Sequence, residues 1–330
     1  MGKVAIILLA GGEASRYKAS LKSLVNNYQD KLLSKRGNIS LLEFVVGELR
    51  PLGDIFIVTK GEERKKRYSA LLNEYVQNND VKIISEHIKK SIGPLGGIYS
   101  VLKHCGNIQT TVILPADLPN VKEKVIAELI AKAFHSKSFD LVSLVHPNGQ
   151  TEHLVLIIRF SELLRASQFL IDMDIHRVSS LIRLISKKRF INSAYLIKDT
   201  ENNEVFYDLD IPSSIPKIRT SIKPVVNFPY VDFGLPIVTD EKPEDPSVLY
   251  QKFLDLKKND KSKDQQGKHP SLIALLQKES NIYKERGLLS LSLHCLLDMY
   301  KINQDPIISD QIDELIMKLE PKGENQTSLG

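Results

Sequence analysis

The sequence predicts an α/β protein, with a three-layer α/β/α domain built on a mainly parallel sheet and a small all-helical module after it. Three observations support this fold class. Short runs of branched apolar residues, typical of strands buried on both faces, recur through the first two thirds of the chain. Segments with helical periodicity separate these runs, and this alternation favours parallel strands joined by crossover helices. Beyond residue 247 only helical patterns remain.

In chain order, the strand patterns lie at 4–9, 54–59, 81–85, 112–114, 140–145 and 154–159, with shorter ones at 190–197 and 204–208. The helical patterns of the same region lie at 40–52, 60–78, 98–104, 121–136 and 178–188. A Rossmann-like sheet of this kind carries its active site along the carboxyl ends of its strands. We therefore expect the functional residues in the loops that follow the strands.

The rest of the chain divides into a linker and a helical module. Residues 223–247 are rich in proline and lack periodicity, so they are predicted as a linker or as an extended strap over the first domain. Helical patterns follow at 247–257, 270–285, 288–301 and 307–319. We therefore expect three parts, residues 1–222, 223–247 and 248–330, the last of them binding a small-molecule substrate or a protein partner.

The composition is that of a globular protein with a mild positive charge. The 330 residues carry a formal net charge of +5, and no basic patch interleaved with aromatic residues points to nucleic acid. Cys105 and Cys295 lie far apart, which argues against a disulfide framework or a cysteine metal site. No apolar run approaches the ~18–20 residues of a membrane-spanning helix. We expect a cytoplasmic protein that binds anionic small molecules, and neither nucleic acid nor membranes.

The first candidate site follows the first strand. The apolar run 4–10 breaks into Gly11, Gly12 and Glu13, with Arg16 shortly after. Paired glycines bring backbone N–H groups close to a ligand, and an arginine adds a fixed positive charge, so the segment is suited to binding phosphate at a strand end. A plain Gly-Gly turn after an edge strand is the alternative.

Two later segments favour phosphate chemistry. The strand pattern 112–114 leads to Asp117, which lies between Pro115 and Pro119 and is therefore presented rigidly. A carboxylate placed near a triphosphate is a usual ligand of Mg²⁺, although Asp117 could also cap a helix. The glycine-rich segment 93–98 precedes it and could equally be a turn into a helix that starts near Ile98.

In this order and spacing, the segments resemble the molybdenum cofactor guanylyltransferases, a MobA-like family of nucleotidyltransferases. The resemblance covers about residues 3–215. It rests on segments that have counterparts in the family: Leu9-Ala10-Gly11-Gly12, Arg16, Asp30-Lys31-Leu32-Leu33, Glu86, Gly93-Pro94-Leu95-Gly96, Asp117-Leu118-Pro119, Glu152-His153-Leu154 and Asp208-Leu209-Asp210-Ile211-Pro212. It implies a nucleotidyltransferase domain that transfers GMP from GTP to the phosphate of molybdopterin and releases pyrophosphate.

The resemblance also implies roles for individual residues. Backbone N–H groups of Gly11, Gly12 and Glu13 would bind the β- and γ-phosphates. Arg16 and Lys31 would neutralise charge on the α-phosphate and on the leaving pyrophosphate. Asp117 would hold Mg²⁺, with Asp208 or Asp210 as second ligand. The nucleotide base would lie in a pocket lined by Leu9, Ala10, Glu86, Gly93 and Gly96.

The sequence departs from the family pattern at two places. Lys22 stands six residues after Arg16, the family's usual interval, whereas Lys31 has the better downstream context, so Lys22 is the rival of Lys31. Asp208 and Asp210 replace asparagines, which puts the acceptor in doubt. The alternatives are guanylyl or cytidylyl transfer to another phosphorylated acceptor, such as cobinamide phosphate or a sugar phosphate, and a non-catalytic nucleotide-binding protein whose helices bind a partner.

Overall fold

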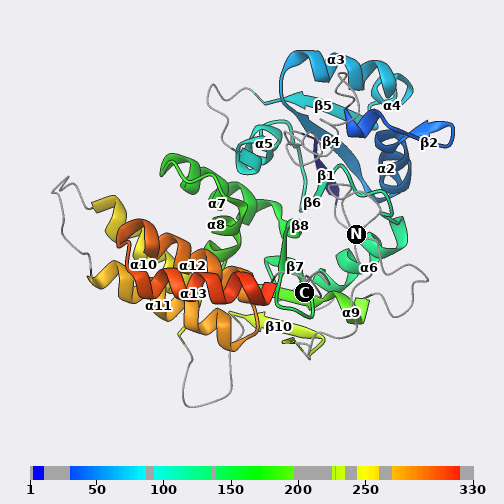
Figure 1. The fold of residues 1–330 in the computed structure, drawn as a ribbon. Coiled ribbons are helices and arrows are strands. Elements are labelled where there is room, and N and C mark those ends of the chain that lie inside the picture. The colour runs from blue at the N-terminus through cyan, green and yellow to red at the C-terminus, as the bar shows by residue number, and fades with distance from the viewer. Residues whose placement is uncertain are drawn as a thin grey trace, which may run out of the picture.

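The computed structural model describes residues 3–10, 30–86, 93–134, 139–196, 225–226, 228–234, 244–259 and 270–319. Within these ranges, eight strands form one sheet in the order β10-β9-β7-β8-β6-β1-β4-β5 (Figure 1). Their bounds are β1 Val4–Leu9, β4 Asp54–Thr59, β5 Val81–Ser85, β6 Thr110–Pro115, β7 Leu141–Val145, β8 Thr151–Arg159, β9 Lys188–Asn192 and β10 Tyr230–Phe233. A two-stranded hairpin, β2 (Lys35–Arg36) and β3 (Ile39–Ser40), stands apart from the sheet.

The sheet is mainly parallel, as the sequence predicted. Strands β1, β4, β5 and β6 run in one direction, as do β7 and β9, whereas β8 and β10 are antiparallel to their neighbours. The chain moves outward from β1 through β4 to β5 and then returns to the other side of β1 with β6. This reversal makes the carboxyl ends of β1 and β6 the switch point at which ligands bind in sheets of this type.

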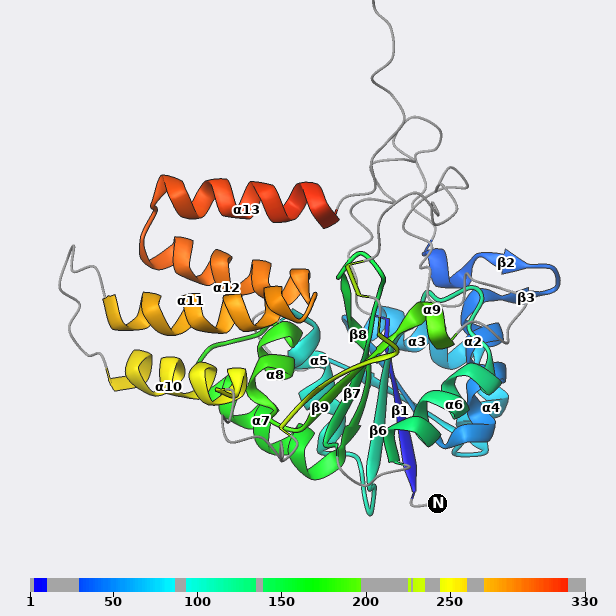
Figure 2. The same ribbon diagram turned by 90° about the horizontal axis from the view of Figure 1, so that it is seen from below.

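Helices cover both faces of the sheet, which confirms the three-layer prediction (Figure 2). One apolar cluster joins one sheet face to α2 (Leu41–Leu49), α3 (Glu62–Leu71) and α6 (Glu123–Phe134). Another joins the opposite face to α5 (Gly93–Leu102), α7 (Phe160–Asp172) and α8 (Val178–Leu184). The remaining short elements of this part are α4 (Asn73–Gln77), α9 (Ser193–Leu196), η1 (Lys31–Leu33) and η2 (Arg50–Leu52).

The C-terminal helices are α10 (Pro246–Asn259), α11 (Pro270–Glu285), α12 (Leu289–Ile302) and α13 (Pro306–Leu319). Helices α10 and α12 pack against α8, α11 packs between α10 and α12, and α13 packs on α12 (Figure 2). Buried residues of all four belong to the same apolar cluster as α5, α7 and α8. This confirms the predicted helical module and shows that the module shares a core with the sheet. No helix among the described residues is long and apolar enough to cross a membrane.

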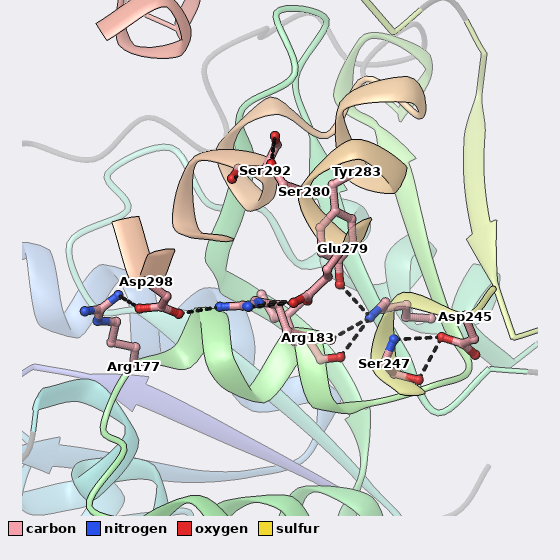
Figure 3. Close-up of polar contacts among 11 residues, drawn as sticks. Arg177, Arg183, Asp245, Ser247, Glu279, Ser280, Tyr283, Ser292 and Asp298 are labelled. Atoms are coloured by element: carbon pink, nitrogen blue, oxygen red, sulfur yellow. Dashed lines mark hydrogen bonds and ion pairs between the residues drawn. The ribbon is translucent and has the colours of Figure 1, made fainter. Parts of the chain in front are cut away.

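A buried ion network crosses the boundary between α8 and the C-terminal helices (Figure 3). Arg183 of α8 is 1% exposed, and its Nε and Nη2 donate to the two carboxylate oxygens of Glu279 at 2.8 and 2.6 Å. Its Nη1 donates to Asp298 of α12 at 2.7 Å, and Asp298 also accepts from Arg177 at 3.2 Å.

The Arg183 guanidinium lies 3.9 Å from the centre of the Tyr250 ring of α10. Nearby, the buried ammonium of Lys188 donates to Tyr283 at 3.1 Å.

Several elements differ from the sequence prediction. Helix α7 was not predicted, although Leu163, Ala166 and Leu170 of its buried face have helical spacing. Strand β10 lies within the segment 223–247 that was predicted as a linker or strap, and it pairs with β9 as the outermost strand of the sheet. An edge strand tolerates the prolines that flank it. Helix α5 begins at Gly93 and not near Ile98. The predicted strand 204–208 lies outside the described residues.

Candidate active site

The candidate site lies along the carboxyl ends of the parallel strands. Ala10 follows β1, Glu86 follows β5 and Asp117 comes two residues after β6. Backbone hydrogen bonds extend the pairing just past these ends, from Ala10 N to Val58 O at 2.8 Å, from Ala116 N to Leu9 O at 3.1 Å and from Glu86 N to Thr59 O at 2.9 Å. Three segments far apart in the sequence therefore meet at one sheet edge, as predicted.

Lys31 and Asp117, 86 residues apart, are in direct contact at this edge. The Lys31 ammonium donates a hydrogen bond to Asp117 Oδ2 and forms an ion pair with it. The two side chains are only 12% and 15% exposed, so solvent screens the pair weakly. The structure thus brings together two of the residues expected to act in catalysis. The rival Lys22 lies outside the described residues.

Asp30 holds the segment that carries Lys31, and sequence reasoning missed this role. Its buried carboxylate accepts from the Tyr68 hydroxyl at 2.7 Å and pairs with Arg64 Nε at 3.3 Å, both from α3. Its other oxygen accepts from Leu32 N at 3.2 Å and caps the short helix η1. An aspartate directly before a short Lys-Leu-Leu turn is a cap signal, so the sequence contained a hint of this anchor.

Glu86 lies at the end of β5, on the side expected to hold the nucleotide base. Its Oε1 is buried and, within the described residues, has no hydrogen-bond partner; the same is true of Thr59 Oγ1 at the end of β4. Burial raises the pKa of Glu86, and the positive charge of Lys60 opposes the rise. A buried polar oxygen without a partner is uncommon in a folded protein and calls for an explanation, which a bound ligand would supply.

The glycine-rich segment forms the start of α5. Gly93 has φ +63°, a left-handed conformation that glycine adopts without strain. Gly96 is buried within the first turn, and at Gly97 an added Cβ would lie 2.8 Å from Val58 Cγ1 of β4. The glycines therefore let the helix approach the sheet closely. Of the predicted base-pocket residues, Leu9, Ala10, Glu86, Gly93 and Gly96 all lie near this end of β1, β4 and β5.

Part of the predicted site falls outside the described residues, namely Gly11, Gly12, Glu13, Arg16, Asp208 and Asp210. Within the described ranges, no group of three or more histidine, cysteine or acidic side chains is placed to hold a metal ion. Among the residues that the structure describes, Asp117 supplies a weakly exposed carboxylate at the switch point. Mg²⁺ at nucleotide sites takes one or two carboxylates and completes its shell with phosphate and water, so this donor is compatible with Mg²⁺.

His153 was named because it follows Glu152 in the family's segment, and the structure shows a packed ring. It lies 4.9 Å from His294 of α12, centre to centre, and its Nε2 hydrogen-bonds Thr151 Oγ1 at 2.7 Å. Burial, helped by the neighbouring His294, lowers the pKa of His153 to about 3. Burial likewise lowers the pKa of His294 to about 4. Both rings are neutral at physiological pH and belong to the contact between β8 and α12.

The chain is similar to known proteins in sequence and, more distantly, in structure. A family model described as "MobA-like NTP transferase domain" matches residues 6–186. A protein of Geobacillus sp. (strain WCH70), described as "Probable molybdenum cofactor guanylyltransferase", is 28% identical over 185 residues, which are 56% of this chain and 83% of that protein. A "Molybdenum cofactor guanylyltransferase" of Xanthomonas euvesicatoria pv. vesicatoria (strain 85-10) is 26% identical over 129 residues, or 39% of this chain and 54% of that one. A solved structure of an Aquifex aeolicus VF5 protein is 15% identical with a TM-score of 0.42, covering 64% of this chain and 95% of that chain.

Proposed function

Because the chain belongs to the family of MobA-like NTP transferase domains, we propose that it transfers GMP from GTP to the phosphate of molybdopterin, with Mg²⁺, and releases pyrophosphate. The observation that carries the proposal is the contact of Lys31 with Asp117 at the switch point between β1 and β6. Phosphoryl transfer needs a positive charge that neutralises the phosphate and a carboxylate that can hold a metal ion, and here the two kinds of group lie side by side. A protein that only bound nucleotide would have no need of charge stabilisation that grows toward the transition state.

In this reaction an oxygen of the acceptor phosphate attacks the α-phosphorus of GTP. The new P–O bond forms as the bond from the α-phosphorus to the bridging oxygen breaks, and that oxygen leaves with pyrophosphate. Lys31 would neutralise the charge that develops on the α-phosphate and on the leaving group. Asp117 would hold Mg²⁺, which supplies Lewis-acid activation of the phosphate. Asp30 acts as a positioning residue, because its bonds to Tyr68 and Arg64 fix the segment of Lys31.

The selectivity for GTP is assigned to Glu86. A carboxylate only accepts hydrogen bonds, and guanine presents two adjacent donors, its N1–H and its 2-amino group. The buried Oε1 of Glu86, which has no partner among the described residues, is suited to such donors. Adenine and cytosine offer a single amino donor beside an acceptor nitrogen, so the second hydrogen bond would be lost.

A direct test measures two quantities in turn. Thermal shifts with Mg²⁺ and each of GTP, CTP, ATP and UTP report base selectivity, since a ligand at a hundredfold excess over Kd adds about 2.7 kcal/mol to stability. Pyrophosphate release with GTP and molybdopterin then reports transfer. We expect the largest shift with GTP and release only when both substrates are present. Equal shifts from all four nucleotides would remove the assigned base selectivity.

Variants of the central pair sharpen this test. Lys31→Met should abolish most pyrophosphate release, whereas Lys132→Met should leave it unchanged, because Lys132 pairs with Glu128 on the surface of α6. Full activity in Lys31→Met would transfer the assigned role to another cation, Lys22 being the first to examine.

A further inference from the structure

The carboxyl edge of the sheet continues beyond Asp117 to a second group of polar side chains. Strand β8 is antiparallel to β6, with Ile113 opposite Leu156, so β8 begins where β6 ends. Pairing with β6 ends at these two residues, and β8 shifts its register against β7 between Leu156 and Thr151. Glu152 is placed at the carboxyl edge by its contact with His146, the residue that follows β7. His146 follows β7 at the same edge. The β7–β8 hairpin rises there beside the C-terminal helices (Figure 2).

The side chains of this hairpin are held in a fixed arrangement. His146 Nε2 hydrogen-bonds Glu152 Oε1 at 2.5 Å, and His146 Nδ1 hydrogen-bonds Ser193 Oγ at 2.9 Å. Both ring nitrogens are therefore engaged. His146 is 19% exposed and Glu152 25%, so the carboxylate stays partly exposed to solvent while the imidazole restricts its rotamer.

We propose that Glu152, oriented by His146, binds a hydrogen-bond donor of the acceptor and that α12 holds this site in place. The inference rests on the proposed function. The base is assigned to the ends of β1, β4 and β5, and the reacting phosphorus to Lys31 and Asp117. With the base on one side of β6, the acceptor is assigned to the other side of this edge, over β8 and β7.

The chemistry of the pair defines what part of the acceptor it takes. A carboxylate repels the acceptor's phosphate and accepts hydrogen bonds from N–H or O–H groups. The phosphate is drawn instead to the ammonium of Lys31. Glu152 therefore binds an amino, ring N–H or hydroxyl group away from the phosphate, and molybdopterin carries such groups on its pterin ring. This adds a specificity-determining contact to the proposed reaction.

Helix α12 braces the hairpin from the other side. Ser290 Oγ accepts from Thr151 N at 2.9 Å and hydrogen-bonds Thr151 Oγ1 at 2.6 Å, directly before Glu152. Ser290 N donates to Gly149 O at 3.3 Å. Gly149 has φ +87°, and an added Cβ there would lie 2.5 Å from Gly287 O, so the turn and the start of α12 approach as closely as backbones can. In this way the C-terminal helices become part of the acceptor side.

The test compares binding and turnover in four variants with intact nucleotide chemistry. Glu152→Gln should raise the Kd and KM for molybdopterin by about ten- to a hundredfold, the range of a hydrogen bond to a charged group, with GTP affinity unchanged. His146→Gln and Ser290→Ala should raise the same KM less, because they only loosen the carboxylate. Glu162→Gln, in the first turn of α7 just past the opposite end of β8, is the matched control and should leave every constant unchanged.

Molybdopterin binding is measured with a non-hydrolysable GTP analogue present, so that the readout does not depend on turnover, and thermal midpoints report folding. An unchanged Kd for molybdopterin in folded Glu152→Gln would overturn the inference while leaving the proposed function intact. Failure of the wild-type protein to bind molybdopterin would overturn both. A rise in the GTP Kd equal to that for molybdopterin would place Glu152 in the nucleotide site and also overturn it.

Discussion

Replacing Arg183 by methionine tests how firmly the C-terminal helices are joined to the sheet. The substitution keeps most of the side-chain volume but leaves Glu279, which is 0% exposed, without its cation. Removing one partner of a buried ion pair costs about 3–5 kcal/mol, mainly because the remaining charge is desolvated and unpaired. Domain stabilities are about 5–15 kcal/mol, so we expect Arg183→Met to lose about a fifth of the free energy of unfolding or more.

A second substitution separates the orphaned charge from the loss of packing. Glu279→Leu, added to Arg183→Met, removes the unpaired carboxylate. Replacement of a complete buried ion pair by apolar residues is often neutral, so the double variant should regain about 3 kcal/mol over Arg183→Met. Asp298 keeps Arg177 at 3.2 Å and Lys301 at 3.6 Å in both variants, and therefore does not become a second orphan.

Urea unfolding followed by circular dichroism gives these free energies, since the chain has no tryptophan to report fluorescence. Thiol labelling adds a local probe, because Cys295 is buried in α12 and Cys105 is half-buried just after α5. Labelling of both at one urea concentration indicates that module and sheet unfold together. A loss below about 1 kcal/mol in Arg183→Met, the contribution of an exposed pair, with no recovery in the double variant, would refute the reasoning.

Three further predictions concern the site and the module. Asp117→Asn should lower the rate of GMP transfer about 10²–10³-fold with little change in GTP affinity, and single-turnover kinetics would reveal near-normal transfer if Asp117 has no such role. Glu86→Gln should reduce the thermal shift with GTP, and with it the difference from the shifts with the other nucleotides. An unchanged difference would exclude Glu86 from base recognition. His153 and His294, whose pKa values burial lowers to about 3 and about 4, are neutral when folded and take up protons when unfolded. Above pH ~6.5 the two rings are neutral in both states, and the free energy of unfolding is unaffected by their protonation. As the pH falls toward 4, protonation of the unfolded rings lowers the free energy of unfolding by up to about 1.4 kcal/mol per ring and pH unit. In the His153→Gln/His294→Gln variant, the free energy of unfolding measured in urea should fall less steeply as the pH is lowered. A slope equal to that of the wild-type protein would contradict the assignment of neutral rings.

Several strands were predictable from the sequence because apolar residues dominate them, although β5, the last strand of the sheet, carries the exposed Lys82. The predicted strands 4–9, 54–59 and 81–85 coincide with β1, β4 and β5. Uninterrupted branched apolar residues fix both the element type and its ends. Strand β10 was hidden by its flanking prolines, which suit a sheet edge as well as a linker. The start of α5 was hidden because Gly93 and Pro94 are turn residues in most contexts.

The site was predictable only in outline. The sheet topology alone places Ala10, Glu86 and Asp117 at one edge, since all three follow parallel strands. The resemblance to a family assigned Lys31 and Asp117 to one site, but their direct contact was not predicted, because side chains 86 residues apart leave no periodic signal. The pairing of Arg183 with Glu279 was also out of reach, as charged residues on a helix normally face solvent.

The ion network of Arg183 also bears on the proposed acceptor site. Arg183 fixes α11 and α12 against α8, and Ser290 of α12 fixes the β7–β8 hairpin that carries Glu152. Lys31, Glu86 and Asp117, the residues proposed to contact the nucleotide, belong to η1 and to the ends of β5 and β6, away from this chain of contacts. Arg183→Met should therefore weaken molybdopterin binding more than GTP binding under conditions where the protein is still folded, and Glu279→Leu in the same chain should restore part of it. The affinities are measured by titrating GTP and molybdopterin into the wild-type protein, Arg183→Met and the double variant. An equal loss of affinity for the two ligands would show that the helices support the whole domain and not its acceptor side alone.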